Sequence, residues 1–520
     1  MKITLFALNA SFTHTNLAVR CLASELSKAG FEPYIQEYTL KDRKARVLYE
    51  LAQTNSQIYA FSVYIWNRKE MLWYAGELKK IKPDIRIIFG GPEVSFENED
   101  FLKEHPFIDT LILGEGESVI TQICENPIKY RIVHGIPADD FITNGILYDR
   151  YPAKGDILYY ESTRGCPYRC SYCLSSLSEN IRAKSAEQTL DELLEFESLE
   201  PRPAIIKFID RTFNYDISRA KKIWKGLISD RYTLNYHFEI AADLLDEECF
   251  EILANMPAGK IQFEAGIQST NQNTLRAINR KPNSTTIINN LTRLRSTDNI
   301  HIHADLIAGL PYEDTASFKK SFDEAINCCH KLQLGFLKML KGSSIRNDAD
   351  MHEYIFDSDP PYKVYANKYI SYKELYHIER IAATVDRFYS SGKFENTMSY
   401  VIPKLPSPFD FFSDLTALQT KDLEKTSQHE CRLMLIAYLK DDKVALEKLA
   451  LDTLIHENNP PPKELNGYYT EYTPDALAYS KEDLKNIKIN NIKIYSFDFD
   501  EENYYLINRT KHIMKKRRIL

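Results

Sequence analysis

The sequence predicts an α/β protein with an N-terminal doubly wound, Rossmann-like domain, a partial TIM-type (β/α)6 barrel and a mostly helical C-terminal domain. Three observations predict this order. Short, β-branched apolar runs alternate with helical-period stretches up to about residue 126. Roughly six more strand–helix units follow. Helical patterns then dominate. We therefore expect domains at 1–126, 157–342 and 343–520, with a linker at 127–156.

Each predicted strand of the first domain is short and apolar. The expected strands are 3–8, 31–38, 58–64, 85–89 and 110–113, and a helix from Asn16 to Ala29 is ended by Gly30. Parallel sheets bind ligands at the carboxyl ends of their strands. The unusual residues lie there, in the loops 9–16, 62–67, 90–95 and 114–118.

The second domain repeats the same alternation. The expected strands are 157–162, 204–209, 236–240, 261–267, 301–307 and 332–339, with helices such as 185–199 and 314–330 between them. Barrel proteins of this kind place function on loops at the carboxyl ends of the strands. The architecture of residues 343–520 does not follow from the pattern.

Composition restricts the class of protein. The 520 residues carry a net charge of −7, with 44% hydrophobic and 27% charged residues, which is typical of a globular protein. No apolar run approaches the ~18 residues of a membrane helix, and the N-terminal residues resemble a strand rather than a signal peptide. The acidic balance argues against nucleic acid. We expect a cytoplasmic protein without a membrane segment.

The nine cysteines include one informative group. Cys166, Cys170 and Cys173 form a CxxxCxxC spacing directly after the first strand of the barrel. Three thiolates on one loop can hold three corners of a [4Fe–4S] cluster and leave the fourth iron open. The alternatives are a zinc site, which needs a fourth nearby ligand, or buried structural thiols. The odd number of cysteines and the missing export signal argue against disulfides.

With the aromatic Tyr172 before its third cysteine, this motif resembles that of the radical S-adenosylmethionine (SAM) superfamily. The resemblance implies that Cys166, Cys170 and Cys173 bind the catalytic [4Fe–4S] cluster and that its open iron chelates SAM. It further implies SAM contacts from Tyr172 and from the strand ends. The candidates at those ends are Asp210, Glu239, Gln268, Ser269 and Gly309. Each alone is also typical of an ordinary turn or helix cap.

The loops of the first domain contain pairs of glycines that would let a large flat ligand lie against backbone. No GxGxxG follows the first strand, which disfavours a dinucleotide. The GGPxxS loop at 90–95 and the GEGE loop at 114–117 resemble the cobalamin-binding domain of many radical SAM enzymes. The cobalamin contacts that this resemblance implies are Ser11, His14, Asn16, Ser62, Trp66, Asn67, Gly90, Gly91, Glu93, Ser95, Gly114, Glu115 and Gly116.

One departure from the cobalamin-domain pattern concerns cobalt. The DxHxxG motif, whose histidine ligates cobalt, is absent, and His14 is the only histidine in these loops. The resemblance therefore implies base-off cobalamin with a weak lower ligand or none. We favour the ordinary interpretation of His14 as a loop histidine that bonds nearby backbone.

Two further histidines alternate with an aspartate on one strand. His301, His303 and Asp305 share one strand face by the period-two rule. They have either a radical or acid–base role or the ordinary role of hydrogen-bonded core histidines.

As a whole, the chain resembles cobalamin-binding radical SAM proteins that carry an uncharacterised helical C-terminal domain. The resemblance implies an anaerobic methyltransferase that acts on an unactivated carbon through a 5′-deoxyadenosyl radical. It implies the cofactors [4Fe–4S], SAM and cobalamin, and a low-potential electron donor of the flavodoxin or ferredoxin type. The substrate is an unknown small molecule or peptide.

Three alternatives remain open at this point. The first keeps both cofactors but performs cyclisation, ring rearrangement or oxidation without methyl transfer. The second is a methylthiotransferase, disfavoured because the first domain holds only Cys21 and Cys124 where that family has three further cluster cysteines. The third is a non-catalytic cobalamin sensor, with the basic run 511–518 serving a partner; a solvated charged segment explains that run as well.

Overall fold

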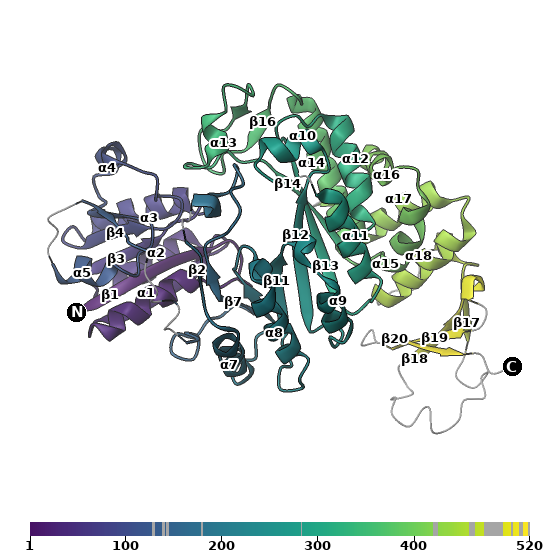
Figure 1. The fold of residues 1–520 in the computed structure, drawn as a ribbon, viewed down its shortest axis with the longest axis horizontal. Helices are drawn as coiled ribbons and strands as arrows, with labels where there is room; N and C mark the ends of the chain where they lie inside the picture. The colour runs from purple at the N-terminus through teal and green to yellow at the C-terminus, as the bar shows by residue number, and fades with distance from the viewer. Residues whose placement is uncertain are drawn as a thin grey trace. The chain divides into compact units, whose positions relative to one another are not determined.

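The computed structural model describes residues 1–126, 131–137, 141, 145–177, 180–281, 283–419, 425–456, 463–472, 492–500, 503–508 and 513–517. The chain forms two compact units. The first unit combines residues 1–314 with 335–372, and the second combines 315–334 with 373–520. Figure 1 traces their elements.

The first unit begins with a six-stranded parallel sheet in the order β2-β1-β3-β4-β5-β6. Its strands are β1 (Lys2–Asn9), β2 (Glu32–Thr39), β3 (Ile58–Ser62), β4 (Arg86–Gly90), β5 (Thr110–Leu113) and β6 (Ile132–His134). The helices are α1 (Leu17–Lys28), α2 (Lys44–Gln53), α3 (Arg68–Ile81), α4 (Glu99–Glu104) and α5 (Ile120–Glu125). The predicted doubly wound fold is confirmed.

Both faces of this sheet are covered, because each central strand is apolar on both sides. Phe6 and Phe61 pack in one buried cluster with side chains of α2 and α3. Ile3 and Leu5 pack on the opposite face with side chains of α1 and α5. Asn16 caps α1 by accepting from the Val19 amide at 3.1 Å, which fixes where the β1–α1 loop ends.

The edge strand β6 lies inside the segment expected to be a linker. It pairs in parallel with β5. Later in the segment, the Tyr151 and Pro152 carbonyl oxygens accept hydrogen bonds from Arg20 of α1, so this part packs on the first domain. Three residues give too short a pattern to be recognised from sequence periodicity.

A second six-stranded sheet follows in the order β14-β13-β12-β11-β10-β7. Its strands are β7 (Ile157–Tyr160), β10 (Ile205–Phe208), β11 (Asn235–Ile240), β12 (Ile261–Gln268), β13 (His301–Ala308) and β14 (Lys331–Phe336). Helices between them include α7 (Ala186–Glu197), α8 (Ile217–Leu227), α9 (Glu247–Ala254), α10 (Gln272–Ala277) and α11 (Ser284–Arg295). The strands β7 and β10 to β13 pair in parallel. This is the predicted (β/α)6 partial barrel.

The segment 335–372 belongs to the first unit and packs against loops of both sheets. It contains α13 (Ser344–Asn347) and the antiparallel pair β15 (Ile355–Phe356) and β16 (Val364–Ala366). Tyr354 and Asn367 both donate to the Gly309 carbonyl, at 3.0 and 2.9 Å. The Tyr362 hydroxyl donates to Glu93 in the first domain. This segment therefore fixes loops of both sheets.

The second unit is mostly helical, as predicted. Its helices are α12 (Thr315–Ile326), α14 (Tyr372–Val385), α15 (Glu395–Val401), α16 (Pro408–Ala417), α17 (Gln428–Leu439) and α18 (Lys443–His456). It also contains an antiparallel sheet that the sequence did not indicate. The strands are β17 (Thr470–Tyr472), β18 (Ile492–Ser496), β19 (Asn503–Asn508) and β20 (Ile513–Arg517).

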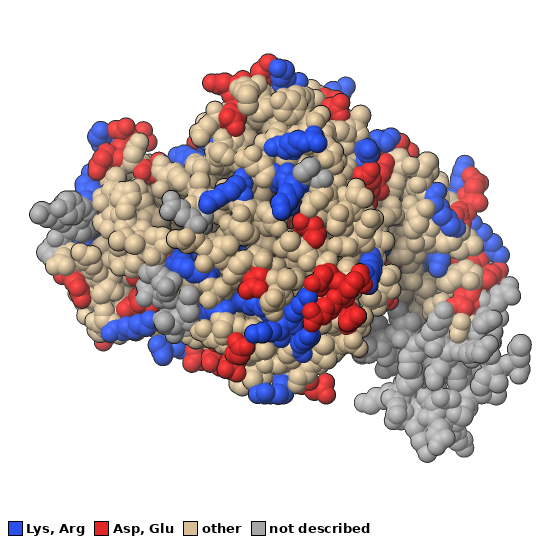
Figure 2. Space-filling model, viewed as in Figure 1, with Lys and Arg blue, Asp and Glu red and all other residues tan. Residues whose placement is uncertain are grey.

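Charged side chains of both signs alternate over the described residues of the face in Figure 2. Between α8 and α9, for example, Lys221 pairs with Asp246 at 2.6 Å and with Glu248 at 2.8 Å. In the described part of the chain, no helix is long and apolar enough to cross a membrane.

Candidate functional site

The cysteine loop leaves β7 and is held by backbone geometry. Gly165 precedes Cys166 with φ +103°, and a Cβ there would lie 2.7 Å from the Asn180 carbonyl oxygen. A short antiparallel pair, β8 (Thr163–Arg164) and β9 (Arg182–Ala183), closes the base of the loop. Only glycine meets both requirements, so the loop is built to hold Cys166 at the carboxyl end of β7.

The three thiols suit a cluster better than a single ion. All three cysteines are free, and Cys170 is buried whereas Cys166 and Cys173 are partly exposed. A tetrahedral zinc site needs a fourth nearby ligand, and no further Cys or His follows in this loop. A cubane places each thiolate on a separate iron, so three thiolates on one loop fit three of its corners.

Arg280 lies beside this loop, and sequence reasoning missed it. Its guanidinium is 3.9 Å from the Cys170 sulfur, 3.4 Å from the Tyr172 hydroxyl and 2.8 Å from the Gly266 carbonyl oxygen. Burial raises the pKa of the Cys170 thiol, and Arg280 opposes that rise. A fixed positive charge next to a thiolate would stabilise a negatively charged cluster. Nothing in the local sequence distinguishes this arginine.

Asp210, a predicted SAM contact, is fully buried and organises the start of the cysteine loop. Its carboxylate accepts from the Ser162 amide at 2.8 Å, the Thr163 amide at 3.1 Å and the Ser162 hydroxyl. Because these hydrogen bonds use both oxygens of the Asp210 carboxylate, the residue supports the cysteine loop and does not point a free carboxylate at a ligand. Burial raises its pKa despite these hydrogen bonds.

The other predicted SAM contacts lie at strand ends. Gln268 ends β12 with φ +68°, and Gly266 leaves room for its side chain, since a Cβ there would lie 2.0 Å from Gln268 Nε2. The buried Ser269 hydroxyl donates to Glu313 at 2.6 Å. Gly309 follows β13 with φ +88°. Tyr172 is half-buried, with burial raising its pKa.

A cavity of about 770 Å³ lies between the carboxyl ends of the first sheet and the strand ends β7, β10 and β11. Most predicted cobalamin contacts line it: His14, Asn16, Ser62, Trp66, Gly90, Gly91, Ser95, Gly114, Glu115 and Gly116. Its inner part runs along α1 and the sheet and is apolar, with Leu22, Ile88, Ile112 and Ile120 among its walls. A large ligand with an apolar tail would fit such a space.

Glycine allows the loops to approach one another at the cavity wall. Gly91 has φ +118°, and a Cβ there would lie 2.5 Å from the Val63 carbonyl oxygen. Gly114 has φ +84°. These glycines let one loop pack against the backbone of another. That a ligand lies against their backbone stays a prediction.

Three of the predicted cobalamin contacts do not line this cavity. Asn67 is fully buried and bonds the Leu8 and Ser62 carbonyl oxygens at 3.0 and 3.2 Å. Glu93 is buried against Arg68 at 3.0 Å. The Ser11 hydroxyl lies 2.8 Å from that of Thr13. These side chains support the loops.

The barrel side of the cavity is charged. Lys207, Arg211 and Glu239 line it from β10, the loop after β10, and β11. Burial raises the pKa of Glu239 to about 7, although Arg211 opposes the rise. A carboxyl that titrates near neutrality in a ligand cavity is a candidate for proton transfer or ligand binding.

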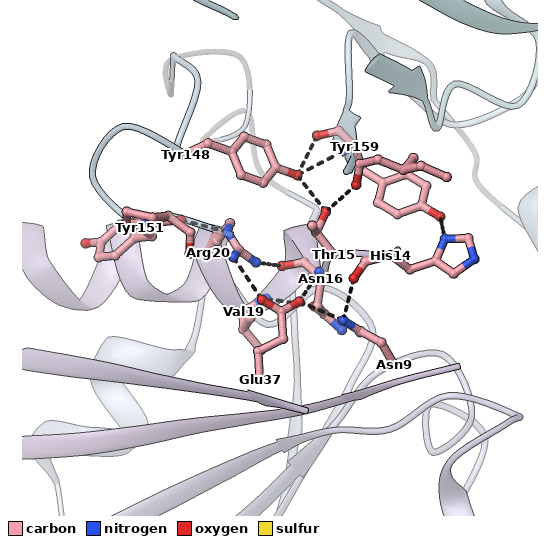
Figure 3. A network of polar contacts seen from close by, with 12 residues as sticks. Asn9, His14, Thr15, Asn16, Val19, Arg20, Glu37, Tyr148, Tyr151 and Tyr159 are labelled. Carbon is pink, nitrogen blue, oxygen red and sulfur yellow. Dashed lines mark hydrogen bonds and ion pairs between the residues drawn. The ribbon is translucent and has the colours of Figure 1, made fainter. Parts of the chain in front are cut away.

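His14 faces the barrel from the β1–α1 loop. Its Nδ1 lies 2.7 Å from the Tyr159 hydroxyl on β7, as Figure 3 shows. Burial and the charge of Lys207 lower its pKa, which favours the neutral ring. The same network holds Arg20 against Glu37 at 2.9 Å. His14 thus has a structural partner, but that partner is a side-chain hydroxyl of the barrel and not the nearby backbone that the loop interpretation expected.

Comparisons with known proteins agree with this geometry. Residues 3–123 match the model of the B12 binding domain, 160–325 that of the Radical SAM superfamily, and 350–512 a protein family of unknown function, DUF4080. A curated relative, the 2-(S-pantetheinyl)-carbapenam-3-carboxylate methyltransferase of Streptantibioticus cattleyicolor, is 26% identical over 305 residues. The match spans 51% of this chain and 44% of the relative, so the chain matches less than half of that protein.

Two solved structures share the fold. One is the cobalamin-dependent SAM radical enzyme OxsB with aqua-cobalamin, with a TM-score of 0.57 and 14% identity over 87% of this chain and 79% of that one. The other is the radical SAM methyltransferase TsrM of Kitasatospora setae with cobalamin and a [4Fe–4S] cluster. Its TM-score is 0.55, with 15% identity over 70% of this chain and 79% of that one.

The fold and the cysteine loop define a radical SAM protein with an N-terminal B12-binding domain. The residues after the barrel, 350–512, match the DUF4080 model, so the three matched domains follow one another along the chain. A [4Fe–4S] cluster, SAM and cobalamin, the three cofactors predicted from the sequence, are those of these two domain families.

Proposed function

We propose that this chain is a cobalamin-dependent radical SAM methyltransferase that acts on an unactivated carbon. The observation that supports this most is the single cavity of about 770 Å³ that the first-domain loops share with the barrel strand ends. When bound, the cofactors would supply a carbon-centred radical and a transferable methyl group. The chain's own contribution is to hold both reaction partners in line and keep water out.

Residues are assigned to these groups as follows. Cys166, Cys170 and Cys173 hold the cluster, and Arg280 balances its charge. SAM lies at the strand ends near Tyr172, Glu239, Gln268, Ser269 and Gly309, while Asp210 supports the cluster loop. The cobalamin lies against the cavity-lining loops, with its tail in the apolar part beside Leu22 and Ile120. His14 lines the same cavity with its Nδ1 on the Tyr159 hydroxyl. Because the DxHxxG context is absent, we assign it no role as a strong cobalt ligand.

We also propose an electron donor, a substrate class and a cellular compartment for the protein. A low-potential flavodoxin or ferredoxin reduces the cluster, the substrate is a small molecule or peptide, and the protein works in the cytoplasm. We propose the domains 1–126, 157–342 and 343–520, with the first extended to include β6 and with residues 343–372 packed in the first compact unit.

The experiment uses methyl-labelled SAM with the anaerobically reconstituted chain and a low-potential reductant. We expect S-adenosylhomocysteine, 5′-deoxyadenosine and methionine, with the label also in a further product when cell extract supplies substrate. The methionine formed with 5′-deoxyadenosine keeps the labelled methyl group and is therefore not counted. Cys173→Ala should abolish 5′-deoxyadenosine and leave cobalamin binding intact. Deoxyadenosine formation without label in any product other than methionine would instead support the cyclising or oxidising alternative.

A further inference from the structure

Three neighbouring barrel strands each bring one metal-ligating side chain to the same place. His237 lies on β11, Glu264 on β12 and His303 on β13, and candidate ligand atoms of the three all lie within 4.8 Å of one another. The registers place Glu264 directly beside His303 and, on the other side, beside Glu239. His237 is two residues before Glu239 and therefore shares its face.

This face of the sheet is the polar one. On β12 the side chains of Ile261, Phe263, Ala265 and Ile267 are buried in the core, whereas Gln262, Glu264 and Gly266 between them are only half-buried. The three candidate ligands thus lie on the side away from the apolar core. The His237 side chain is 7% exposed and that of Glu264 is 20% exposed, so little hydration has to be removed when a ligand binds there.

We propose that His237, Glu264 and His303 bind one divalent transition-metal ion. Two imidazoles and one carboxylate are a donor set that Zn²⁺, Mn²⁺ and Fe²⁺ accept. His237 Nε2 already lies 2.9 Å from Glu264 Oε2, and the rings of His237 and His303 are 5.3 Å apart between centroids and nearly perpendicular. Ligand atoms about 2.1 Å from one ion lie roughly 3 to 4 Å apart, so small side-chain rotations suffice.

The site is separate from the cysteine loop in position and chemistry. Its donors are nitrogen and oxygen in the middle of strands, whereas Cys166, Cys170 and Cys173 are sulfurs on a loop beyond a strand end. Three protein ligands leave coordination positions open, the arrangement of metal sites that take a substrate or water. The sequence pattern of His301, His303 and Asp305 pointed to this face but not to His237 or Glu264.

A Lys207 variant tests the site most directly, because the Lys207 ammonium competes with a metal ion for the Glu264 carboxylate. Its Nζ lies 3.0 Å from Glu264 Oε2, the same atom that faces His237. An arriving cation would be repelled by this ammonium and would have to displace it from Glu264. Removing the charge while keeping the length of the side chain should therefore strengthen metal binding, by about 10-fold or more for a repulsion over a few ångströms.

The experiment titrates the cluster-loaded chain with Zn²⁺ alone, after removal of loosely bound metal, and counts bound zinc by equilibrium dialysis and mass spectrometry. The bound cluster occupies Cys166, Cys170 and Cys173, so these thiolates do not bind the added zinc. We expect one zinc per chain in the wild type, at least tenfold tighter binding in Lys207→Met, and loss of that zinc in His303→Ala and Glu264→Gln. His301→Ala, a neighbour outside the set, is the matched control and should keep it.

X-ray absorption at the zinc edge of the wild-type protein tests the site without any variant. Nitrogen and oxygen neighbours with the signature of two imidazoles support it, and sulfur neighbours overturn it. No stoichiometric zinc in either the wild type or Lys207→Met also overturns it, as does equal binding by His303→Ala. The titration requires no turnover, so failure of the methyltransferase proposal leaves this result unaffected.

Discussion

Arg164, two residues before the first cluster cysteine, donates a hydrogen bond to Glu115 of the first-domain GEGE loop at 2.8 Å. It also pairs with Glu117 at 2.9 Å and Glu161 at 2.7 Å, and Arg182 bonds Glu115 as well. Burial disfavours the charge on Glu115, yet the bonds from Arg182 and Arg164 outweigh burial and hold its pKa below the usual value. The cobalamin-facing loop and the cluster loop are therefore joined by partly buried ion pairs.

Arg164→Met should lower the free energy of unfolding by about 2 kcal/mol, because it removes the cation paired with Glu117 and Glu161 and leaves Glu115 with Arg182 alone. Cobalamin retention should weaken with it. Urea unfolding and cobalamin binding measure the two effects. Lys103→Met, which breaks an exposed pair with Asp100, is the control and should change stability by less than about 0.5 kcal/mol. Equal effects of the two variants would contradict a structural role for Arg164.

Cys170→Ala should remove the cluster. Iron after anaerobic reconstitution should fall from about four per chain to nearly zero, since two thiolates cannot retain a cubane. Cys249→Ala, at a buried thiol on α9, should keep full iron. Iron analysis and the visible absorption of the cluster measure this. Retention of iron by Cys170→Ala would show that another residue serves as ligand.

Gly91→Ala should cost more stability than Gly30→Ala. Both glycines have positive φ, which costs an alanine roughly 1 to 2 kcal/mol, but a Cβ at Gly30 meets nothing within 4 Å. At Gly91 it would also press on the Val63 carbonyl, so the loop must move and cobalamin binding should fall. Thermal unfolding and cobalamin titration measure the difference. Indistinguishable variants would contradict the close approach at this loop.

The half-buried Glu239 should make stability depend on pH. Its pKa rises from the ordinary 4.5 to about 7, chiefly through burial, so the folded state binds more protons than the unfolded state between these values. The free energy of unfolding should therefore fall as pH rises from about 4.5 to about 7. Glu239→Gln should flatten this dependence, and Glu251→Gln, at an exposed position, should not. Urea unfolding at several pH values decides it.

The sequence predicted well what local patterns encode. The apolar runs of β1 and β12 and the cysteine spacing each carry their own signal within about ten residues. What it missed depends on distant partners. Arg280 reaches Cys170 across 110 positions, Tyr362 reaches Glu93 across 269, and β6 is defined only by its pairing with β5.

The same reason explains the site residues whose position differed from expectation. Asn67 and Glu93 have the residue types and loop positions of ligand contacts, but their side chains turn inward to Leu8 and Arg68. A polar loop residue either contacts a ligand or forms hydrogen bonds that hold the loop, and the sequence alone does not distinguish the two. The antiparallel strands β17 to β20 were missed although Ile and Tyr recur in them, because each run has only three to six residues and is recognised through its pairing with the next.

The central claim is that one chain holds a [4Fe–4S] cluster on its cysteine loop and a cobalamin in the cavity between the first-domain loops and the barrel strand ends. Anaerobic reconstitution with iron, sulfide and cobalamin, followed by metal analysis of the same sample, tests it most directly. We expect about four irons and one cobalt per chain, and 5′-deoxyadenosine once SAM and reductant are added. A chain that binds the cluster and cleaves SAM but retains no cobalt would contradict the claim.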